Sequence, residues 1–275
     1  MKYPGKRSSI FLAVIGLSMA ATIASAGPIV PGFNGSTLAA NDDGSTGAVG
    51  LGFNFDFFGT TYSQLYVNNN GNATFGSSLS TYTPFGLTTN TAIPILAPFF
   101  GDVDTRGVGS GLVTYGTGSY NGYSAFGINW PGVGYYSRHT NKLNTFQMLI
   151  VDRADTGAGN ADVYFNYGSI QWETGDASGG SNGLGGSSAH AGYSNGSGNA
   201  GTYYELAGSG INGAFLNGGP DALVSGTNDG VAGQFLFQVR NGQVIQPPGS
   251  VPEPAALALF GIGLTGLAAS RRRKK

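Results

Sequence analysis

Alternation of apolar and polar side chains constrains this chain more than any other feature. In residues 145–151 the side chains of Phe146, Met148 and Ile150 fall on one face, as in an extended strand with one buried side. The same alternation recurs in two further segments, residues 162–167 and 234–239. No stretch between residues 27 and 250 shows a sustained helical period, so a parallel sheet covered by helices is not expected. The pattern predicts an all-β chain.

Short strand-like segments and tight turns extend this pattern. Asn70-Gly71 separates two such segments and Asn121-Gly122 precedes another, and an Asn-Gly pair between strands is a strong signal for a β-hairpin. The 49 Gly, 17 Phe and 14 Tyr suit many strands joined by turns. We expect further strands in residues 51–58, 64–67, 73–75, 112–115, 124–130 and 189–193.

The body of the chain is expected to form one domain. Residues 175–201 hold 10 Gly with several Ser and Asn, which predicts a long, flexible Gly/Ser-rich loop that a short strand at 189–193 could interrupt. A clean strand pattern resumes at residues 235–239. We therefore predict a single antiparallel β-sandwich-like domain over residues 27–245 and a linker at 246–250. The absence of cysteine excludes disulfides, thiolate zinc sites and cysteine nucleophiles.

The N-terminal end carries the features of an export signal. Lys2, Lys6 and Arg7 precede an apolar stretch, and the small residues 24–26 follow it. This order predicts a signal peptide over residues 1–26 that is cleaved after Ala26. A short uncleaved membrane anchor is the alternative.

The net charge of −1 for the whole chain conceals an acidic body. Residues 27–250 contain five cations and 13 acids, a net charge of −8. The cations are Arg106, Arg138, Lys142, Arg153 and Arg240. An acidic body repels nucleic acid and anionic lipid, so no nucleic-acid partner is expected.

The C-terminal end, residues 251–275, combines three features of a sorting signal. Residues 255–270 are apolar but would span only about 24 Å as a helix, which is marginal against a hydrocarbon core of about 30 Å. Pro252 and Pro254 stop a helix from continuing back into the body, which leaves the segment before the apolar run extended and accessible. The basic block that follows would stay cytoplasmic, and it consists of Arg271, Arg272, Arg273, Lys274 and Lys275.

This end resembles the PEP-CTERM sorting signal of Gram-negative bacteria. Val251, Pro252, Glu253 and Pro254 match the family motif residue for residue. The resemblance implies transient inner-membrane insertion of the C-terminal helix, recognition by an exosortase-type processing enzyme, and delivery to the cell surface or the exopolysaccharide matrix. A permanent tail anchor is the alternative.

The body resembles the nidogen-like (NIDO) extracellular domain over about residues 36–240. Five motifs occur in the order found in that family: NDDGSTGAVGLGFNFDFFGTTYSQLYVNNNGNATFG (41–76), ILAPFFGDVDTR (95–106), GINWPGVGYY (127–136), NTFQMLIVD (144–152) and VYFNYGSIQWETG (163–175). The resemblance implies an extracellular, non-enzymatic, β-rich domain of the kind found in matrix and cell-adhesion proteins. The chain has no flanking cysteine-rich modules, so the partners of animal relatives do not carry over.

Asp102 and Asp104 are the candidate metal ligands. They follow a proline-aromatic strand, and their Asp-x-Asp spacing would put both carboxylates on one face, where calcium could bridge them. Residues 41–43, Asn-Asp-Asp, form a second acidic turn. The alternative is that these Asp residues serve only the turns, and no other cofactor is expected.

The sequence gives less support to an enzymatic function than to adhesion. Ser194 is central to a G-x-S-x-G match, but both histidines, His139 and His190, precede it, against the order of the hydrolase triad. Glu173 and Glu205 are the two body glutamates that a glycosidase could use, with Trp172 as a sugar platform. Four tyrosines could stack on sugars or pack in the sheets: Tyr135, Tyr136, Tyr203 and Tyr204.

The sequence therefore predicts a surface-sorted adhesion or matrix protein without catalytic residues. Extracellular polysaccharide or a matrix protein is the expected partner. A polysaccharide-processing hydrolase of the cell surface and a purely structural matrix component are the alternatives.

Overall fold

Strands make up nearly all the regular structure of the residues that the computed structural model describes, Met1 and residues 28–245. The predicted signal peptide, linker and sorting segment lie outside these residues. Within residues 28–245 there are 13 strands, one short 3-10 turn and no α-helix. Every pairing between named strands is antiparallel. The prediction of an all-β antiparallel fold is confirmed.

The larger sheet has seven strands in the order β1-β6-β7-β8-β9-β12-β13. Their bounds are Ser36–Thr37 (β1), Thr114–Tyr120 (β6), Tyr123–Tyr135 (β7), His139–Asp152 (β8), Ala161–Ser169 (β9), Gln234–Arg240 (β12) and Gln243–Ile245 (β13). The alternation seen in the sequence explains its central strands. Phe146, Met148 and Ile150 of β8 are all buried in the main core, as the period of two predicts.

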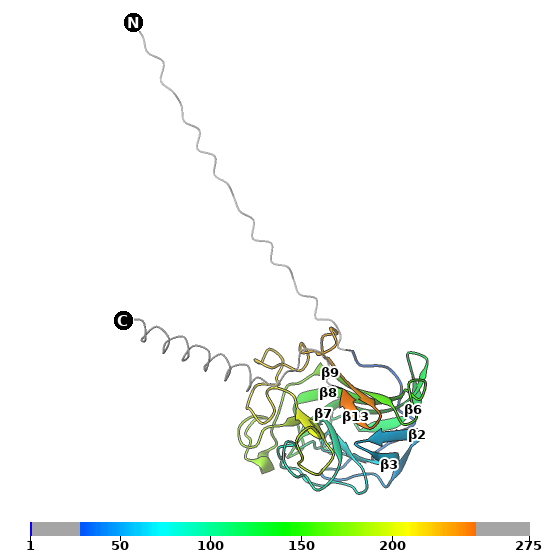
Figure 1. Ribbon diagram of the computed structural model, residues 1–275. Coiled ribbons are helices and arrows are strands. Elements are labelled where there is room, and N and C mark those ends of the chain that lie inside the picture. Colours follow the sequence, from blue (N-terminus) through cyan, green and yellow to red (C-terminus); the bar gives the residue numbers. More distant parts are fainter. Residues whose placement is uncertain (2–27, 246–275) are drawn as a thin grey trace, which may run out of the picture.

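The second sheet has six strands in the order β11-β10-β5-β4-β3-β2. Their bounds are Val49–Phe57 (β2), Thr60–Asn68 (β3), Asn72–Thr74 (β4), Ile95–Phe100 (β5), His190–Ser194 (β10) and Tyr203–Glu205 (β11). β2 and β3, drawn in blue in Figure 1, lie beside the green strands of the larger sheet, and β2 contacts both β7 and β8. The two sheets form the predicted sandwich.

Aromatic side chains fill the space between the sheets. The ring of Phe99 in β5 lies 5.3 Å from that of Phe146 in β8, and Trp130 in β7 stacks on Phe146 at 4.9 Å. Trp172 meets the ring of Phe99 edge-on. All four side chains are at most 1% exposed, and burial of each contributes roughly 2–3 kcal/mol. The core between the sheets holds together a chain without disulfides.

The Gly/Ser-rich stretch joins the two sheets. After β9 the chain passes through a 3-10 turn, η1 (Asp176–Ser178), and then enters β10, which pairs with β5 and β11. The strand expected at residues 189–193 is therefore present. Within the stretch before it, paired backbone bonds join Ser181 and Leu184. The carbonyl of Gly183 also accepts the backbone N–H groups of Glu173 and Thr174, so this part of the loop is bonded to the segment that follows β9.

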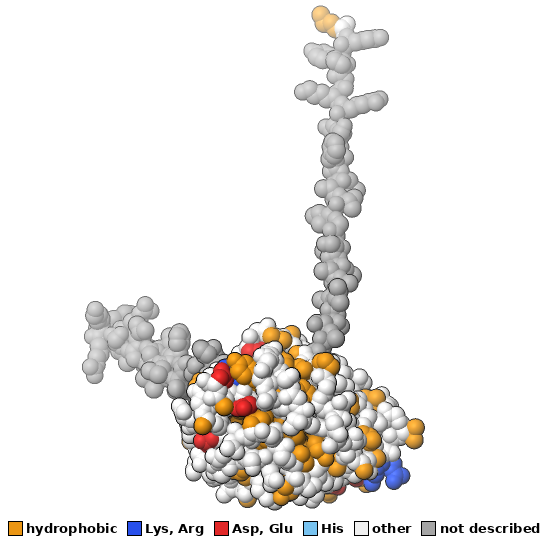
Figure 2. All heavy atoms as spheres, turned by 90° about the vertical axis from the view of Figure 1, so that its right-hand side faces the viewer, with side chains coloured by type: hydrophobic (Ala, Val, Ile, Leu, Met, Phe, Trp, Pro, Cys, Tyr) orange, Lys and Arg blue, Asp and Glu red, His pale blue; other side chains and the backbone are white. Residues whose placement is uncertain are grey.

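The surface carries few charges. The face in Figure 2 is mostly uncharged polar atoms and small apolar patches, with isolated acidic and basic side chains. Residues 28–245 contain no helix long and apolar enough to cross a membrane. The helix expected at residues 255–270 lies outside the described residues.

Candidate functional site

Three aspartates from two distant parts of the chain meet at one end of the sandwich. Asp42 and Asp43 lie in the turn before β2, and Asp102 follows the end of β5. One carboxylate oxygen from each lies within 4.8 Å of those of the other two. We call this group the acidic cluster.

Two asparagines of the β3–β4 turn hold the acidic cluster together. The side-chain amide of Asn69 donates to the backbone carbonyls of Asp42 and Val103, and so links both segments. Asn70 donates to Asp43 Oδ1 at 2.9 Å, while its own oxygen accepts the backbone N–H of Val103 at 3.0 Å. Both asparagines are 1% exposed. Buried amides with these bonds fix the separation of the two acidic segments.

The side chain of Asp102 is buried without a hydrogen-bond partner among the described residues. The residue is 1% exposed, and neither carboxylate oxygen has a partner among the described residues. Burial, followed by the charges of Asp42, Asp43, Asp104 and Asp176, raises the pKa of Asp102 to about 8. A buried carboxylate in this state is costly, because the protein supplies neither a counter-charge nor a donor.

Asp42 belongs to the acidic cluster and also pairs with an arginine. Its Oδ2 accepts from Arg106 Nη2 at 2.9 Å, whereas its Oδ1 is buried and has no partner among the described residues. Burial and the charges of Asp104 and Asp43 raise the pKa of Asp42 to about 6, against the lowering effect of Arg106 and Arg138. Arg106 therefore leaves one oxygen of Asp42 free to bind a cation.

Asp104, predicted as the second ligand beside Asp102, is engaged elsewhere. Its carboxylate accepts Nε and Nη2 of Arg106 at 2.8 and 2.7 Å, and the backbone N–H of Arg138 at 2.8 Å. Burial opposes ionisation, but these bonds outweigh it and lower the pKa of Asp104. The structure thus brings Asp102 together with Asp42 and Asp43, from the second acidic turn, and pairs Asp104 with Arg106.

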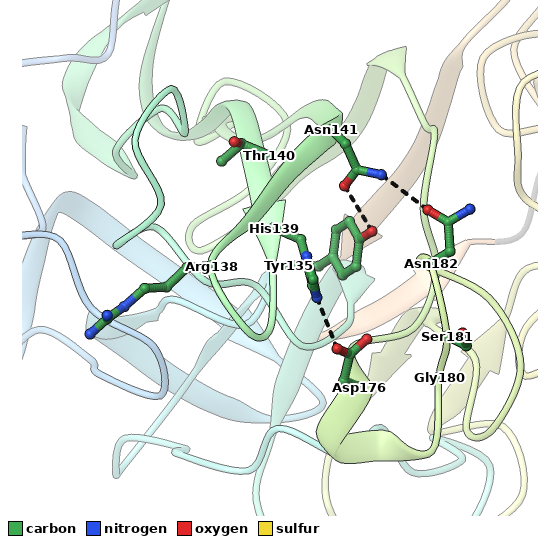
Figure 3. A pocket seen from close by; sticks show the side chains of 9 residues that line it. All are labelled: Tyr135, Arg138, His139, Thr140, Asn141, Asp176, Gly180, Ser181 and Asn182. Atoms are coloured by element: carbon green, nitrogen blue, oxygen red, sulfur yellow. Dashed lines mark hydrogen bonds and ion pairs between the residues drawn. The ribbon is translucent and has the colours of Figure 1, made fainter.

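A polar pocket of about 650 Å³ lies beside the acidic cluster, between the β7–β8 turn and the Gly/Ser-rich loop (Figure 3). His139 Nε2 and Asp176 Oδ2 form a hydrogen bond at 2.8 Å across it, with both side chains about 40% exposed. Tyr135 donates from its hydroxyl to Asn141 at 3.0 Å, and Asn141 donates to Asn182 at 3.0 Å. The lining presents amide, carboxylate, imidazole and hydroxyl groups.

Backbone bonds connect the pocket to the acidic cluster. The N–H of Tyr136 donates to the carbonyl of Asp102, and the N–H of Asp176 donates to the carbonyl of Tyr136, both at 3.1 Å. The Asp102 carboxylate also lies against Gly175, where an added Cβ would come within 2.3 Å of Oδ2. The position of Asp102 is therefore coupled to both walls of the pocket.

Ser194, the candidate nucleophile, is buried and hydrogen-bonded within the fold. Ser194 is buried inside β10, paired with Ile95 and Tyr203. Its hydroxyl accepts from Thr91 Oγ1 and from the backbone N–H of Gly196. No strand–turn–helix element surrounds it within residues 28–245, so the geometry of a nucleophile elbow is missing there.

The two glutamates are occupied by structural contacts. Glu173 is fully buried and accepts the hydroxyl of Ser188 and two backbone N–H groups, those of Gly213 and Phe215. Glu205 pairs with His190 at 2.7 Å.

The candidate sugar-stacking aromatics lie mostly in the core. Trp172 is fully buried and donates from Nε1 to the carbonyl of Val133. Tyr135 is also fully buried, and Tyr204 packs against Tyr193 and Phe237. The packing interpretation holds for these three residues.

A family model of the nidogen-like domain matches residues 63–241. The chain belongs to the nidogen-like domain family. Similar proteins include alpha-tectorin of Gallus gallus, 30% identical over 80% of this chain, and alpha-tectorin of Mus musculus, 31% identical over 75%. Nidogen of Drosophila melanogaster is 32% identical over 74% of this chain.

The matches cover only a small part of these relatives. The aligned region is 10% of each alpha-tectorin and 16% of the nidogen, so what is shared is the nidogen-like domain. No solved structure matches this chain.

A second family model, the PEP-CTERM protein-sorting motif, matches residues 250–274. This segment contains the predicted Val251–Pro254 motif and most of the basic block. The nidogen-like domain is thus part of an exported, surface-associated protein.

Proposed function

We propose that this chain is a non-enzymatic adhesion or matrix protein of a Gram-negative cell surface. The observation that carries the proposal is the order of its parts, a nidogen-like domain followed directly by a PEP-CTERM sorting motif. In this scheme the signal peptide ends at Ala26, a membrane-anchored precursor forms, and an exosortase-type enzyme recognises Val251–Pro254. The domain then remains outside the cell, in contact with exopolysaccharide or matrix protein.

The polar pocket is the proposed contact for polysaccharide. Its rim carries Asn182, His139 and Asp176, all at least partly exposed, so donors and acceptors face outward together. Sugar hydroxyls need both kinds of partner, and amide and carboxylate groups supply them. The bonded pairs Asn141–Asn182 and His139–Asp176 hold these groups in place before a ligand arrives, which reduces the ordering cost of binding.

The absence of catalysis is part of the proposal. Ser194, Glu173 and Glu205 each have the structural partners described above, and His139 forms no hydrogen bond to a serine hydroxyl among residues 28–245. Hydrolysis of a polysaccharide would require a positioned acid and base or nucleophile around one bond. The environments of these residues do not provide that arrangement.

A binding assay tests the proposal. The full chain, purified in mild detergent, is mixed with exopolysaccharide from the producing bacterium and with cells stripped of it, and retention is measured by co-sedimentation. We expect saturable retention by at least one of these. Asn182→Ala combined with His139→Ala should weaken retention by about tenfold or more, because two direct polar contacts would be lost.

The matched control is Asn34→Ala, which removes an exposed asparagine outside the pocket and should bind like the unmodified protein. No retention by polysaccharide or cells, with or without calcium, would refute the adhesion function. Release of shorter sugars from the polysaccharide would refute the non-enzymatic assignment. Equal loss in the pocket variant and the control would refute the pocket as the contact.

A further inference from the structure

We propose that Asp42, Asp43 and Asp102 bind one calcium ion. The inference concerns a ligand set different from the Asp-x-Asp pair suggested by the sequence, and it does not depend on which macromolecule the domain binds. One carboxylate oxygen of each residue lies within 4.8 Å of the other two, which is a spacing that a single cation can bridge.

The second observation that points to a ligand is the state of Asp102. An acidic group on a surface is commonly solvated and needs no cation. Asp102 is 1% exposed, its carboxylate belongs to the acidic cluster, and both oxygens lack a hydrogen-bond partner among the described residues. Buried polar groups are nearly always paired, so these two oxygens indicate a partner of another kind.

Asp42 and Asp43 offer the complementary oxygens. Asp42 Oδ1 is buried and has no partner within the described part of the chain, while its Oδ2 is held by Arg106. Among the described residues, Asp43 accepts from Asn70 through Oδ1, so its second oxygen can turn to a cation. One oxygen from each residue therefore meets in the acidic cluster, and three oxygens of Asp42 and Asp102 have no partner among the described residues.

Local charge favours a divalent cation. Five carboxyl groups interact electrostatically in this region, and only two cations, Arg106 and Arg138, act on them. The five are Asp42, Asp43, Asp102, Asp104 and Asp176. Arg106 is already committed to Asp104 and Asp42. The uncompensated charge is centred on the acidic cluster, where a divalent ion would offset two negative charges.

The ligand type selects among metals. All three side chains provide carboxylate oxygen, and neither histidine belongs to the acidic cluster. Zinc prefers nitrogen and sulfur ligands, whereas calcium and magnesium prefer oxygen. Calcium accepts irregular sets of carboxylate, carbonyl and water oxygens, and magnesium requires a near-ideal octahedron. The three carboxylates come from two separate segments, and one of them, Asp102, is buried. Such an irregular set fits calcium better than magnesium.

Binding would join the turn before β2 to the end of β5. The same two segments are already linked by Asn69 and Asn70, so the site is organised before the ion arrives. Tyr136 donates to the backbone carbonyl of Asp102 and Gly175 lies against its carboxylate, so the ion would stabilise the adjoining walls of the polar pocket.

The test measures calcium binding directly. The full chain in mild detergent is stripped with EDTA, exchanged into chelator-free buffer and titrated with CaCl₂ by calorimetry. We expect one saturable site, with a dissociation constant of about 10⁻⁴–10⁻³ M or lower, as in other extracellular calcium modules. Calcium should also raise the thermal unfolding midpoint, whereas MgCl₂ should bind at least about tenfold more weakly.

Asp102→Asn is the decisive variant. It keeps the shape of the side chain but removes the charge that a cation needs, so the calcium-induced rise in the unfolding midpoint should disappear. In EDTA the variant should unfold at the same temperature as the unmodified protein or higher, because an amide avoids the cost of burying an ionisable carboxyl group that has no partner. If Asp102→Asn does not fold, it will show no cooperative thermal unfolding in EDTA. Asp43→Asn, at a half-buried position, then serves as the second variant.

Asp221→Asn is the control, since Asp221 is exposed and outside the acidic cluster. It should keep the full calcium response. The proposal is overturned if the unmodified protein shows no saturable binding up to about 10 mM calcium, well above the range of extracellular modules. It is also overturned if Asp102→Asn and Asp43→Asn both keep the response, and equal affinity for magnesium would overturn the assignment to calcium. None of these readouts involves polysaccharide, so the two proposals fail separately.

Discussion

At the scale of single residues, the turn between β3 and β4 carries the most consequential contacts. The sequence there predicts a hairpin through Asn70-Gly71, and β3 and β4 do pair on either side of it. The turn pattern does not predict that the buried side chains of Asn69 and Asn70 link residues 42–43 to residue 103 through hydrogen bonds. A run of polar residues beside a predicted turn is expected to be solvated, and only packing buries it.

Gly71 is required in this turn for two reasons. Its φ is +75°, and a Cβ would lie 1.7 Å from the carbonyl oxygen of Phe99. We expect Gly71→Ala to lower the free energy of unfolding by about 3 kcal/mol or more, from backbone strain and the forced displacement of β5. Urea denaturation measures this loss.

Gly122 is the matched control for that substitution. It also follows an asparagine in a hairpin and has a φ of +83°, but nothing lies within 4 Å of a Cβ placed there. Gly122→Ala should cost only about 1–2 kcal/mol, from the left-handed conformation alone. Equal losses in the two variants would show that the contact with Phe99 is unimportant.

At the scale of elements, β5 shows where pattern-based prediction ends. All six of its residues are buried, so it has no alternation of apolar and polar side chains, and Pro98 interrupts its backbone donors. The sequence indicates a proline-aromatic strand before Asp102, within one of the nidogen-like motifs, but not which strands pair with it. Its place between β4 and β10 depends on pairings with distant segments.

The β10–β11 pair is tied to the loop before β5 by Glu205. Its Oε1 accepts from His190 Nδ1 at 2.7 Å and from the backbone N–H of Leu87 at 2.6 Å. Burial opposes ionisation of Glu205, but these bonds outweigh it and lower its pKa below 4.5. Because the folded-state pKa is depressed, the stabilisation is present above pH 4.5 and is lost as the pH falls through the folded value.

Glu205→Gln tests this element. The variant should be less stable than the unmodified protein by about 1–3 kcal/mol at pH 6–7, and the difference should shrink as the pH falls below 4.5. Urea denaturation across this pH range measures it. Asp221→Asn, at an exposed position, should show little difference at any pH. A Glu205→Gln deficit that grows toward acid would have the wrong sign for this explanation.

At the scale of the whole molecule, the parts are arranged for work outside the cell. The sandwich needs no disulfide because aromatic side chains fill its core, and the sorting motif follows the domain closely. Under the proposed function, export and surface placement depend on the ends of the chain, whereas stability depends on the body.

Replacing Pro252 and Glu253 by alanine tests this division. We expect most of the protein to remain in the membrane fraction instead of reaching the surface, because the motif that the sorting enzyme would recognise is lost. Cell fractionation with immunoblotting measures the distribution. Pro247→Ala with Pro248→Ala, before the matched motif, is the control and should leave sorting unchanged. Normal surface delivery of the motif variant would contradict the exosortase route.

The sequence alone determined the class of fold, most strands, the two Asn-Gly hairpins and the sorting motif. These features are local: alternation, turn chemistry and short motifs are written in neighbouring residues. It also identified both acidic turns, but it treated them as separate and paired Asp102 with Asp104. Asp104 instead pairs with Arg106, two positions later in the chain. Only the tertiary structure joined Asp102 to Asp42 and Asp43, 59 to 60 positions earlier. Contacts at such separation arise from strand pairing and burial, which no local pattern records.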